Sequence, residues 1–159
     1  MSGSGKTTLG KRLANELHTD FVDLDWEIEK REGKSVKEIF SQHSEDHFRQ
    51  IEAAELRLWA IAPQDFVMST GGGAPCFYEG INVINHSGLS IFLDVPVGEL
   101  KARLAAATDR PLLNVGDEKE REDKLNFLRT SRLSIYKQAH LTIEDATLDK
   151  LLTAVQTKR

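Results

Sequence analysis

The stretch Ser2-Gly3-Ser4-Gly5-Lys6-Thr7-Thr8 constrains the fold more than any other part of this chain. Small residues let successive backbone N–H groups converge on phosphate oxygens, and a helix that begins near Thr7 adds the positive end of its dipole. Lys6 is placed to reach the β- and γ-phosphates of a nucleotide, and the Thr7 hydroxyl is placed to ligate Mg²⁺. A flexible Gly/Ser leader before an ordinary helix is the alternative reading. The predicted nucleotide-binding residues are Gly3, Ser4, Gly5, Lys6, Thr7 and Thr8.

The apolar pattern that follows predicts alternating helices and strands. Strands are expected over 21–25, 66–70, 90–95 and 141–143. Helices are expected over 7–17, 97–107, 119–138 and 147–157. Two more helices are expected, a short one that begins after a capping box at Ser35 and a longer one with its N-cap at Ser44. Strands separated by helices form βαβ units, so the fold class is α/β, with a parallel sheet covered by helices on both faces.

Composition narrows the functional classes. A length of 159 residues fits one domain, and 40% hydrophobic with 29% charged residues excludes a disordered chain. A net charge of −4 gives no broad basic field for nucleic acid, and no apolar run approaches the ~20 residues that cross a bilayer. The single cysteine, Cys76, excludes an intramolecular disulfide and a multi-cysteine zinc site. We therefore expect neither a nucleic-acid nor a membrane partner.

Two carboxylates follow the first predicted strand. Asp23 and Asp25 lie two residues apart, so on a strand both side chains would leave the same face. Phosphoryl transfer to a hydroxyl needs one carboxylate to accept or orient the proton, and another commonly lies near the metal through water. The alternative is structural, because Asp25 could cap a helix that begins at Trp26.

Six motifs together resemble the shikimate kinases. They are GSGKTTLGKRLA, FVDLD, Phe48-Arg49-x-x-Glu52, Ser69-Thr70-Gly71-Gly72-Gly73, Arg110-Pro111-Leu112-Leu113 and Arg132-x-x-x-Tyr136. They occur in family order across nearly the whole chain. The resemblance implies a three-layer P-loop kinase fold of the nucleoside-monophosphate-kinase type, with a five-stranded parallel sheet of order 2-3-1-4-5. It also implies one domain over 1–159 with a lid at about 109–118, and a monomeric transferase of the cytoplasm.

The activity that the resemblance implies is ATP- and Mg²⁺-dependent phosphorylation of the 3-hydroxyl of shikimate, in aromatic amino acid biosynthesis. By the same resemblance Asp25 accepts from the substrate hydroxyls, and Asp23 and Thr7 hold the metal, Asp23 through water. Arginine suits a carboxylate because its planar fork donates two parallel hydrogen bonds, so Arg49 and Arg132 are the candidate clamp. Glu52 is expected to orient Arg49. The carried-over set is Lys6, Asp25 and Arg110 for catalysis, Arg110 also for ATP, and Asp25, Arg49, Gly72 and Arg132 for shikimate.

The chain departs from the family pattern at its start. Family members carry an apolar first strand and a leading loop glycine ahead of the position of Met1. Losing a central strand would leave backbone donors and acceptors without partners. We therefore expect the natural polypeptide to start upstream of Met1.

Two other functions stay open on the sequence alone. A related small-molecule kinase of the gluconate type would share the phosphate loop but would not need arginines at 49 and 132. A non-catalytic nucleotide-binding module would bind nucleotide without turnover. Arg103 is either an adenine-side contact or a solvated charge, and the His43/His47 pair has no third metal ligand at matching spacing.

Overall fold

The strands of the described chain form two parallel pairs. The computed structural model describes residues 1–105 and 118–158. Strand β1 (Asp20–Asp23) pairs with β2 (Phe66–Ser69), and β3 (Ile91–Asp94) pairs with β4 (Leu141–Glu144). The pairs correspond to neighbours 2–3 and 4–5 of the expected strand order, although the described residues do not join them into one continuous sheet.

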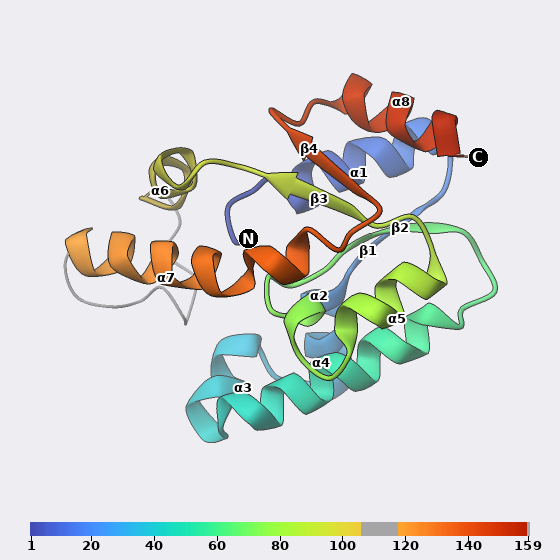
Figure 1. The fold of residues 1–159 in the computed structure, drawn as a ribbon. Helices are drawn as coiled ribbons and strands as arrows, with labels where there is room; N and C mark the ends of the chain where they lie inside the picture. Colours follow the sequence, from blue (N-terminus) through green and yellow to red (C-terminus); the bar gives the residue numbers. More distant parts are fainter. Residues whose placement is uncertain (106–117, 159) are drawn as a thin grey trace.

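Helices cover the strands on both sides, as the alternating pattern predicts. Helices α1 (Lys6–Leu17) and α8 (Leu148–Lys158) lie on one side of the strands, and α4 (Glu45–Ala60) and α5 (Gly80–Ser87) lie on the other (Figure 1). The result is the three-layer α/β architecture expected from the sequence. The remaining elements are α2 (Leu24–Glu32), α3 (Val36–Gln42), the 3₁₀ turn η1 (Ala74–Cys76), α6 (Val97–Ala105) and α7 (Glu118–Tyr136).

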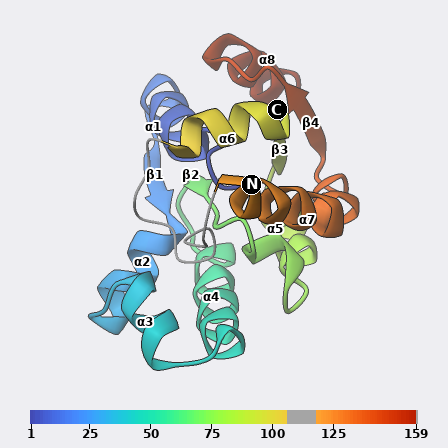
Figure 2. The ribbon, with the colours of Figure 1, turned by 90° about the vertical axis from the view of Figure 1, so that its left-hand side faces the viewer.

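The helices beyond the carboxyl ends of the strands form two groups. Helices α2 and α3 lie on one side of the N-terminus, and α6 and α7 lie on the other (Figure 2). An ion pair between Lys101 and Glu122, with 2.8 Å between Nζ and Oε2, ties α6 to α7. Because parallel strands place their carboxyl ends at one edge, residues at these ends can meet in one site.

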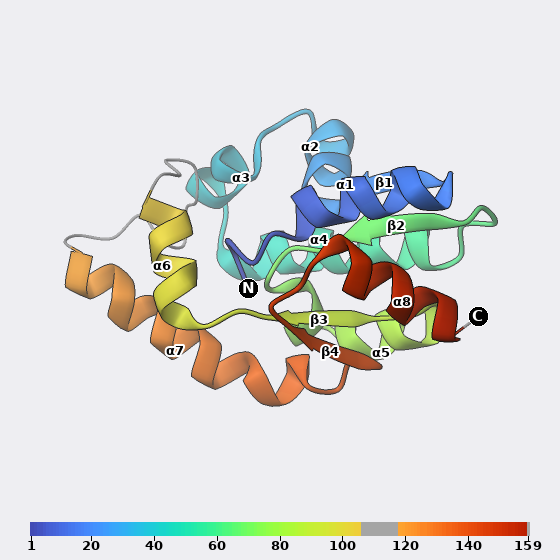
Figure 3. The ribbon, with the colours of Figure 1, turned by 90° about the horizontal axis from the view of Figure 1, so that it is seen from above.

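A cavity of about 700 Å³ lies between the two strand pairs. Its walls include Val67 and Met68 of β2 and Phe92 and Leu93 of β3, with Leu13 of α1 beside them. Figure 3 shows β2 and β3 running in the same direction with a separation between them. This interstrand channel divides the layer that the helices enclose.

Local sequence explains most element boundaries. Ser35 and Glu38 form the expected capping box at the start of α3, and Ser44 accepts a hydrogen bond from the backbone N–H of His47 as the N-cap of α4. The prediction of a strand over 21–25 was wrong at its end. Asp23 closes β1 and caps α2, accepting at 3.2 Å from the backbone N–H of Asp25, so Asp25 lies in the first turn of a helix.

Candidate active site

The phosphate loop is a tight curl in front of α1. Gly5 caps the helix with φ of 90°, in the left-handed region that favours glycine. Lys6 folds back over the loop, and its Nζ donates to the carbonyl of Met1 at 2.6 Å. The Ser4 hydroxyl donates to the same carbonyl at 2.9 Å. The loop thereby gathers a cation and a helix N-terminus at one point, which is an arrangement that attracts phosphate.

Three oxygen-bearing side chains meet next to this loop. The Thr7 hydroxyl donates to Asp23 Oδ2 at 2.9 Å and lies 3.4 Å from the Ser69 hydroxyl. Asp23 and Ser69 are register partners at the ends of β1 and β2, so the sheet itself sets their separation. Hydroxyl and carboxylate oxygens suit Mg²⁺, which binds few protein groups and keeps phosphate and water ligands. Within 1–105 and 118–158, no group of three or more His, Cys, Asp or Glu residues could hold a metal ion.

Asp25 and Glu52 approach each other beside the glycine run. A Cβ atom added at Gly71 would lie 2.6 Å from Glu52 Oε1 and 3.1 Å from Asp25 Oδ1. Burial raises the pKa of the Glu52 carboxyl, the neighbouring Arg49 guanidinium offsets part of that rise, and the charge of Asp25 adds to it. Glu52 Oε1 is buried without a hydrogen-bond partner in the structure. Two carboxyl groups therefore lie close together beside Gly71.

Arg49 is a buried cation held on several sides. Its side chain is 4% exposed, and Nη1 donates to Glu52 Oε2 at 2.7 Å, as the spacing in the sequence predicts. Nη2 donates to Glu45 Oε1 at 3.1 Å, and the guanidinium lies 4.8 Å from the centre of the Phe77 ring. A guanidinium fixed in this way is positioned to meet an anion without further ordering.

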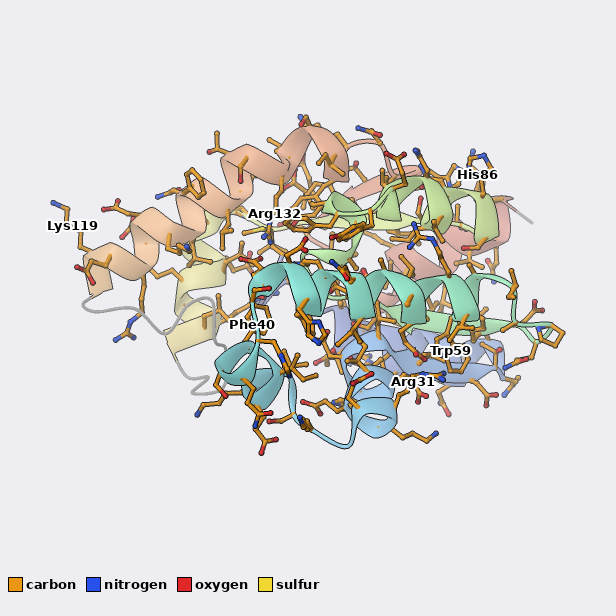
Figure 4. All side chains as sticks on the ribbon, turned by 90° about the horizontal axis from the view of Figure 1, so that it is seen from below. Arg31, Phe40, Trp59, His86, Lys119 and Arg132 are labelled. Atoms are coloured by element: carbon orange, nitrogen blue, oxygen red, sulfur yellow. The ribbon has the colours of Figure 1, made fainter. Side chains whose placement is uncertain are left out.

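Arg132 approaches the same place from a different helix. It projects from α7 (Figure 4), and its guanidinium lies 5.9 Å from the centre of the Phe77 ring, the ring that Arg49 also contacts. Phe77 therefore brings together cations that are 83 positions apart in the chain, counting from residue 49 to residue 132. Gly73 leaves room for one of them, because a Cβ there would lie 2.2 Å from Arg49 Nη1.

One cavity of about 1020 Å³ connects these groups. It is lined by every predicted site residue that the structure describes, namely Gly3, Ser4, Gly5, Lys6, Thr7, Thr8, Asp23, Asp25, Arg49, Gly72 and Arg132. Arg110 and most of the predicted lid lie outside the described residues. Arg103 also lines this cavity, and its Nη1 donates to the Gly3 carbonyl at 3.3 Å, so it touches the phosphate loop.

Several contributors were given no role of their own from the sequence, although Ser69, Gly71 and Gly73 belong to one of the six motifs. Ser69 stands beside the Thr7–Asp23 pair, Phe77 lies against both arginines, and Gly71 and Gly73 provide close-packing positions. Ser69 directly precedes the glycine run at the end of a predicted strand, so its place at the sheet edge could have been inferred. Phe77 carried no comparable signal, because a single aromatic residue after a turn has many possible roles.

Comparisons with known proteins give one consistent result. The family model for shikimate kinase matches residues 2–157. A shikimate kinase of Bacteroides fragilis is 44% identical over 139 residues, covering 87% of this chain and 77% of the relative, and one of Phocaeicola vulgatus is 41% identical over 150 residues, covering 93% and 85%.

Solved structures agree with the sequence relatives. The crystal structure of shikimate kinase from Bacteroides thetaiotaomicron superposes with a TM-score of 0.88 at 36% identity, covering 98% of this chain and 92% of the other. Shikimate kinase from Acinetobacter baumannii, solved in complex with shikimate, superposes with a TM-score of 0.91 at 32% identity, covering 99% and 90%.

Proposed function

This chain belongs to the shikimate kinase family, and we propose that the cavity described above carries out the reaction of that family. The reaction is the ATP-dependent phosphorylation of the 3-hydroxyl of shikimate. The reaction joins a phosphate-rich nucleotide to a small hydroxylated acid. The cavity contains a phosphate loop that suits the nucleotide and two arginines that suit the acid. It also contains a pair of carboxylates, which can take up the proton of the attacking hydroxyl. The coexistence of Lys6, Asp25 and both arginines in one cavity is the observation that carries the proposal.

At the nucleotide end, Lys6 and the backbone N–H groups of residues 3–8 hold the phosphates. Thr7 and Asp23 would hold Mg²⁺, with Asp23 acting through water. A magnesium ion there neutralises charge on the phosphate oxygens. When nucleotide binds, rotation about the single bonds of the Lys6 side chain would let its ammonium exchange the Met1 carbonyl for a phosphate oxygen.

At the acid end, Arg49 and Arg132 bind the substrate carboxylate from two sides. Asp25 accepts the proton of the attacking hydroxyl as its oxygen bonds to the γ-phosphorus and the bond to ADP breaks. Glu52 holds Arg49 in place through the buried ion pair. Gly72 contributes backbone to the substrate side of the cavity.

Residues 109–118 act as a lid in this proposal. Closure of such a segment excludes water, which would otherwise compete with the substrate hydroxyl for the phosphoryl group. Arg110 would bring a cation onto the transferring group. The whole of residues 1–159 then works as one catalytic domain.

An assay of ADP release tests the function directly. ADP formation is measured with shikimate, with gluconate and with no acceptor, at fixed Mg·ATP. We expect release that depends on shikimate. Release that depends on gluconate would favour a related small-molecule kinase, and nucleotide binding without release would favour a non-catalytic module.

We also propose that the enzyme is a cytoplasmic monomer. Among the described residues, no helix is both long and apolar enough to cross a membrane. The proposal of a monomer rests on the match of nearly the whole chain to the shikimate kinase family. Analytical ultracentrifugation should give the mass of a single chain, and a mass twice as large would contradict the monomer.

A further inference from the structure

Tyr136 links the last turn of α7 to the glycine run. Its side chain is buried, and its hydroxyl donates to the carbonyl of Gly72 at 2.6 Å. Its ring stacks on Phe92 of β3, with 5.1 Å between ring centres and 30° between ring planes. The Tyr136 side chain therefore packs against β3 through its ring and binds the glycine run through its hydroxyl.

Each carbonyl of the glycine run has its own donor. The backbone N–H of Ala74 donates to Gly71 O at 3.3 Å, and that of Cys76 donates to Gly73 O at 2.7 Å. These two bonds are internal to the turn that follows. The bond to Gly72 O comes from α7, 64 positions along the chain, and so it alone of the three ties the run to another element.

The contact to Gly72 O also fixes a neighbouring N–H group. A peptide unit is planar, and in the trans form its C=O and N–H point in opposite directions. No cis peptide bond occurs in the described chain. Holding the Gly72 carbonyl toward Tyr136 therefore aims the Gly73 N–H away from α7, and the Gly71–Gly73 run lines the cavity.

Arg132 precedes Tyr136 by four positions on α7, so both lie on one face of the helix. Arg132 lines the cavity, whereas Tyr136 lies in the apolar cluster behind it with Phe92, Leu100 and Leu125. Anchoring Tyr136 sets both the rotation of this last turn and the position of the glycine run. The two substrate-facing elements are thus fixed relative to each other by one phenol.

We propose that Tyr136 is a positioning residue for the acid substrate, through its hydrogen bond to Gly72 and its place one turn after Arg132. This inference rests on the proposed function. Burial raises the pKa of Tyr136 to about 12, so the hydroxyl remains a donor throughout the range in which such an enzyme is assayed. Tyr136 is not among the residues that line the active-site cavity, so in this proposal it acts through the glycine run and through Arg132 on the same helix.

The test is the variant Tyr136→Phe, which keeps the ring stack and removes only the hydroxyl. Tyr78→Phe is the matched control, since Tyr78 is the other tyrosine of the chain and its hydroxyl bonds Asp46 away from the cavity. For Tyr136→Phe we expect the KM for shikimate to rise about three- to tenfold, with the KM for ATP within twofold of the parent value. Tyr78→Phe should leave both constants unchanged.

Two outcomes would overturn the inference. One is an unchanged KM for shikimate in Tyr136→Phe, and the other is an equal rise in both KM values, which would indicate a general structural defect. Calorimetric titration with shikimate and with ADP, each alone, gives the same division if turnover of the variant is too low to measure. If the parent protein shows no shikimate-dependent ADP release, the proposed function fails. If the parent is active and Tyr136→Phe has the same KM values as Tyr78→Phe, only the role of Tyr136 fails.

Discussion

Polar and charged side chains in the cavity have protein hydrogen-bond partners before any ligand arrives. Lys6 is held by the Met1 carbonyl, Thr7 by Asp23, and Arg49 by Glu45 and Glu52. Such contacts lower the entropy cost of binding and place groups near their working geometry. They also mean that truncating one residue can disturb its partner, so variants must be chosen with the partner in view.

Lys6→Ala should strongly slow phosphoryl transfer. The lysine is the cation of the phosphate loop, and losing a preorganised charge at a developing anionic centre costs about 10²–10³-fold in kcat. Lys30→Ala is the control, because Lys30 has a 78% exposed side chain on α2 and does not line the cavity. Steady-state ADP release measures both. Retention of more than a tenth of the parent kcat in Lys6→Ala would contradict the assignment.

Arg132→Ala is the cleaner test of the carboxylate clamp. Arg49→Ala would strand Glu52, which is 1% exposed, without its cation, and breaking a buried ion pair from one side is strongly destabilising. Arg132 is less buried. We expect its loss to raise the KM for shikimate by about 10- to 100-fold, the worth of a charged hydrogen bond, while the KM for ATP stays near the parent value. Arg121→Ala, an exposed position on the same helix, is the control.

At the scale of elements, the site depends on close approach between the glycine run and α4. Gly73→Ala should displace the Arg49 guanidinium, because the new Cβ would lie 2.2 Å from Nη1 of a side chain pinned by two glutamates. We expect a KM for shikimate about tenfold higher, with ATP binding retained. Gly88→Ala has open space around its Cβ and should behave as the parent. Equal KM values for shikimate in the two variants would contradict this, because they would show that the Arg49 side chain can move without weakening substrate binding.

The anchor of α7 gives a prediction about alkaline pH. Tyr136 has its pKa raised from 10 to about 12 by burial, so the unfolded chain loses this proton at lower pH than the folded chain. Its contribution to stability is complete below pH 10 and is lost as the pH rises toward 12. Urea unfolding at pH 8 and at pH 11 should show a smaller loss of unfolding free energy in Tyr136→Phe than in the parent, by about 1–2 kcal/mol. Parallel losses in the two proteins would contradict this.

Element types were largely predictable from the sequence, since the strong signals are local. The capping box at Ser35, the N-cap at Ser44 and the leucine spacing of α1 all predicted helices that the structure contains. Helix α5 was not predicted, because Ile81, Val83 and Ile84 form a short β-branched cluster without a clear cap. The boundary at Asp23 was misplaced because a strand that ends in its own helix cap leaves no break in composition.

The site was predictable as residues but not as geometry. Motif identity gave Lys6, Asp25, Arg49 and Arg132, and all of them line one cavity. The partners that orient them are set by packing between distant elements. The bond from Tyr136 to Gly72 and the contact of Phe77 with both arginines follow from how α7 and α4 each pack against the η1 turn, which one sequence does not reveal.

For the whole molecule, the two strand pairs are joined mainly through helices. Buried clusters on each side include Leu24, Ile28 and Phe48 around α2 and α4, and Leu13, Leu93 and Leu151 where α1 and α8 cover β3. The second cluster also takes in Val67 of β2, so α1 and α8 bridge the interstrand channel. The active-site cavity opens where both strand pairs end. Helices α2 and α3 lie on one side of it, and α6 and α7 lie on the other.

The interstrand channel therefore has a dynamic consequence. Alternate amides of a strand point to opposite edges, so within β2 (Phe66–Ser69) and β3 (Ile91–Asp94) only one set faces its paired strand. In deuterium oxide, for a polypeptide of residues 1–159, we expect amides of the paired edges to be protected and their immediate neighbours, which face the channel, to exchange orders of magnitude faster. Nuclear magnetic resonance would resolve this every-other-residue rhythm. Uniformly slow exchange along both strands would instead mean that the middle of the sheet is sealed in solution.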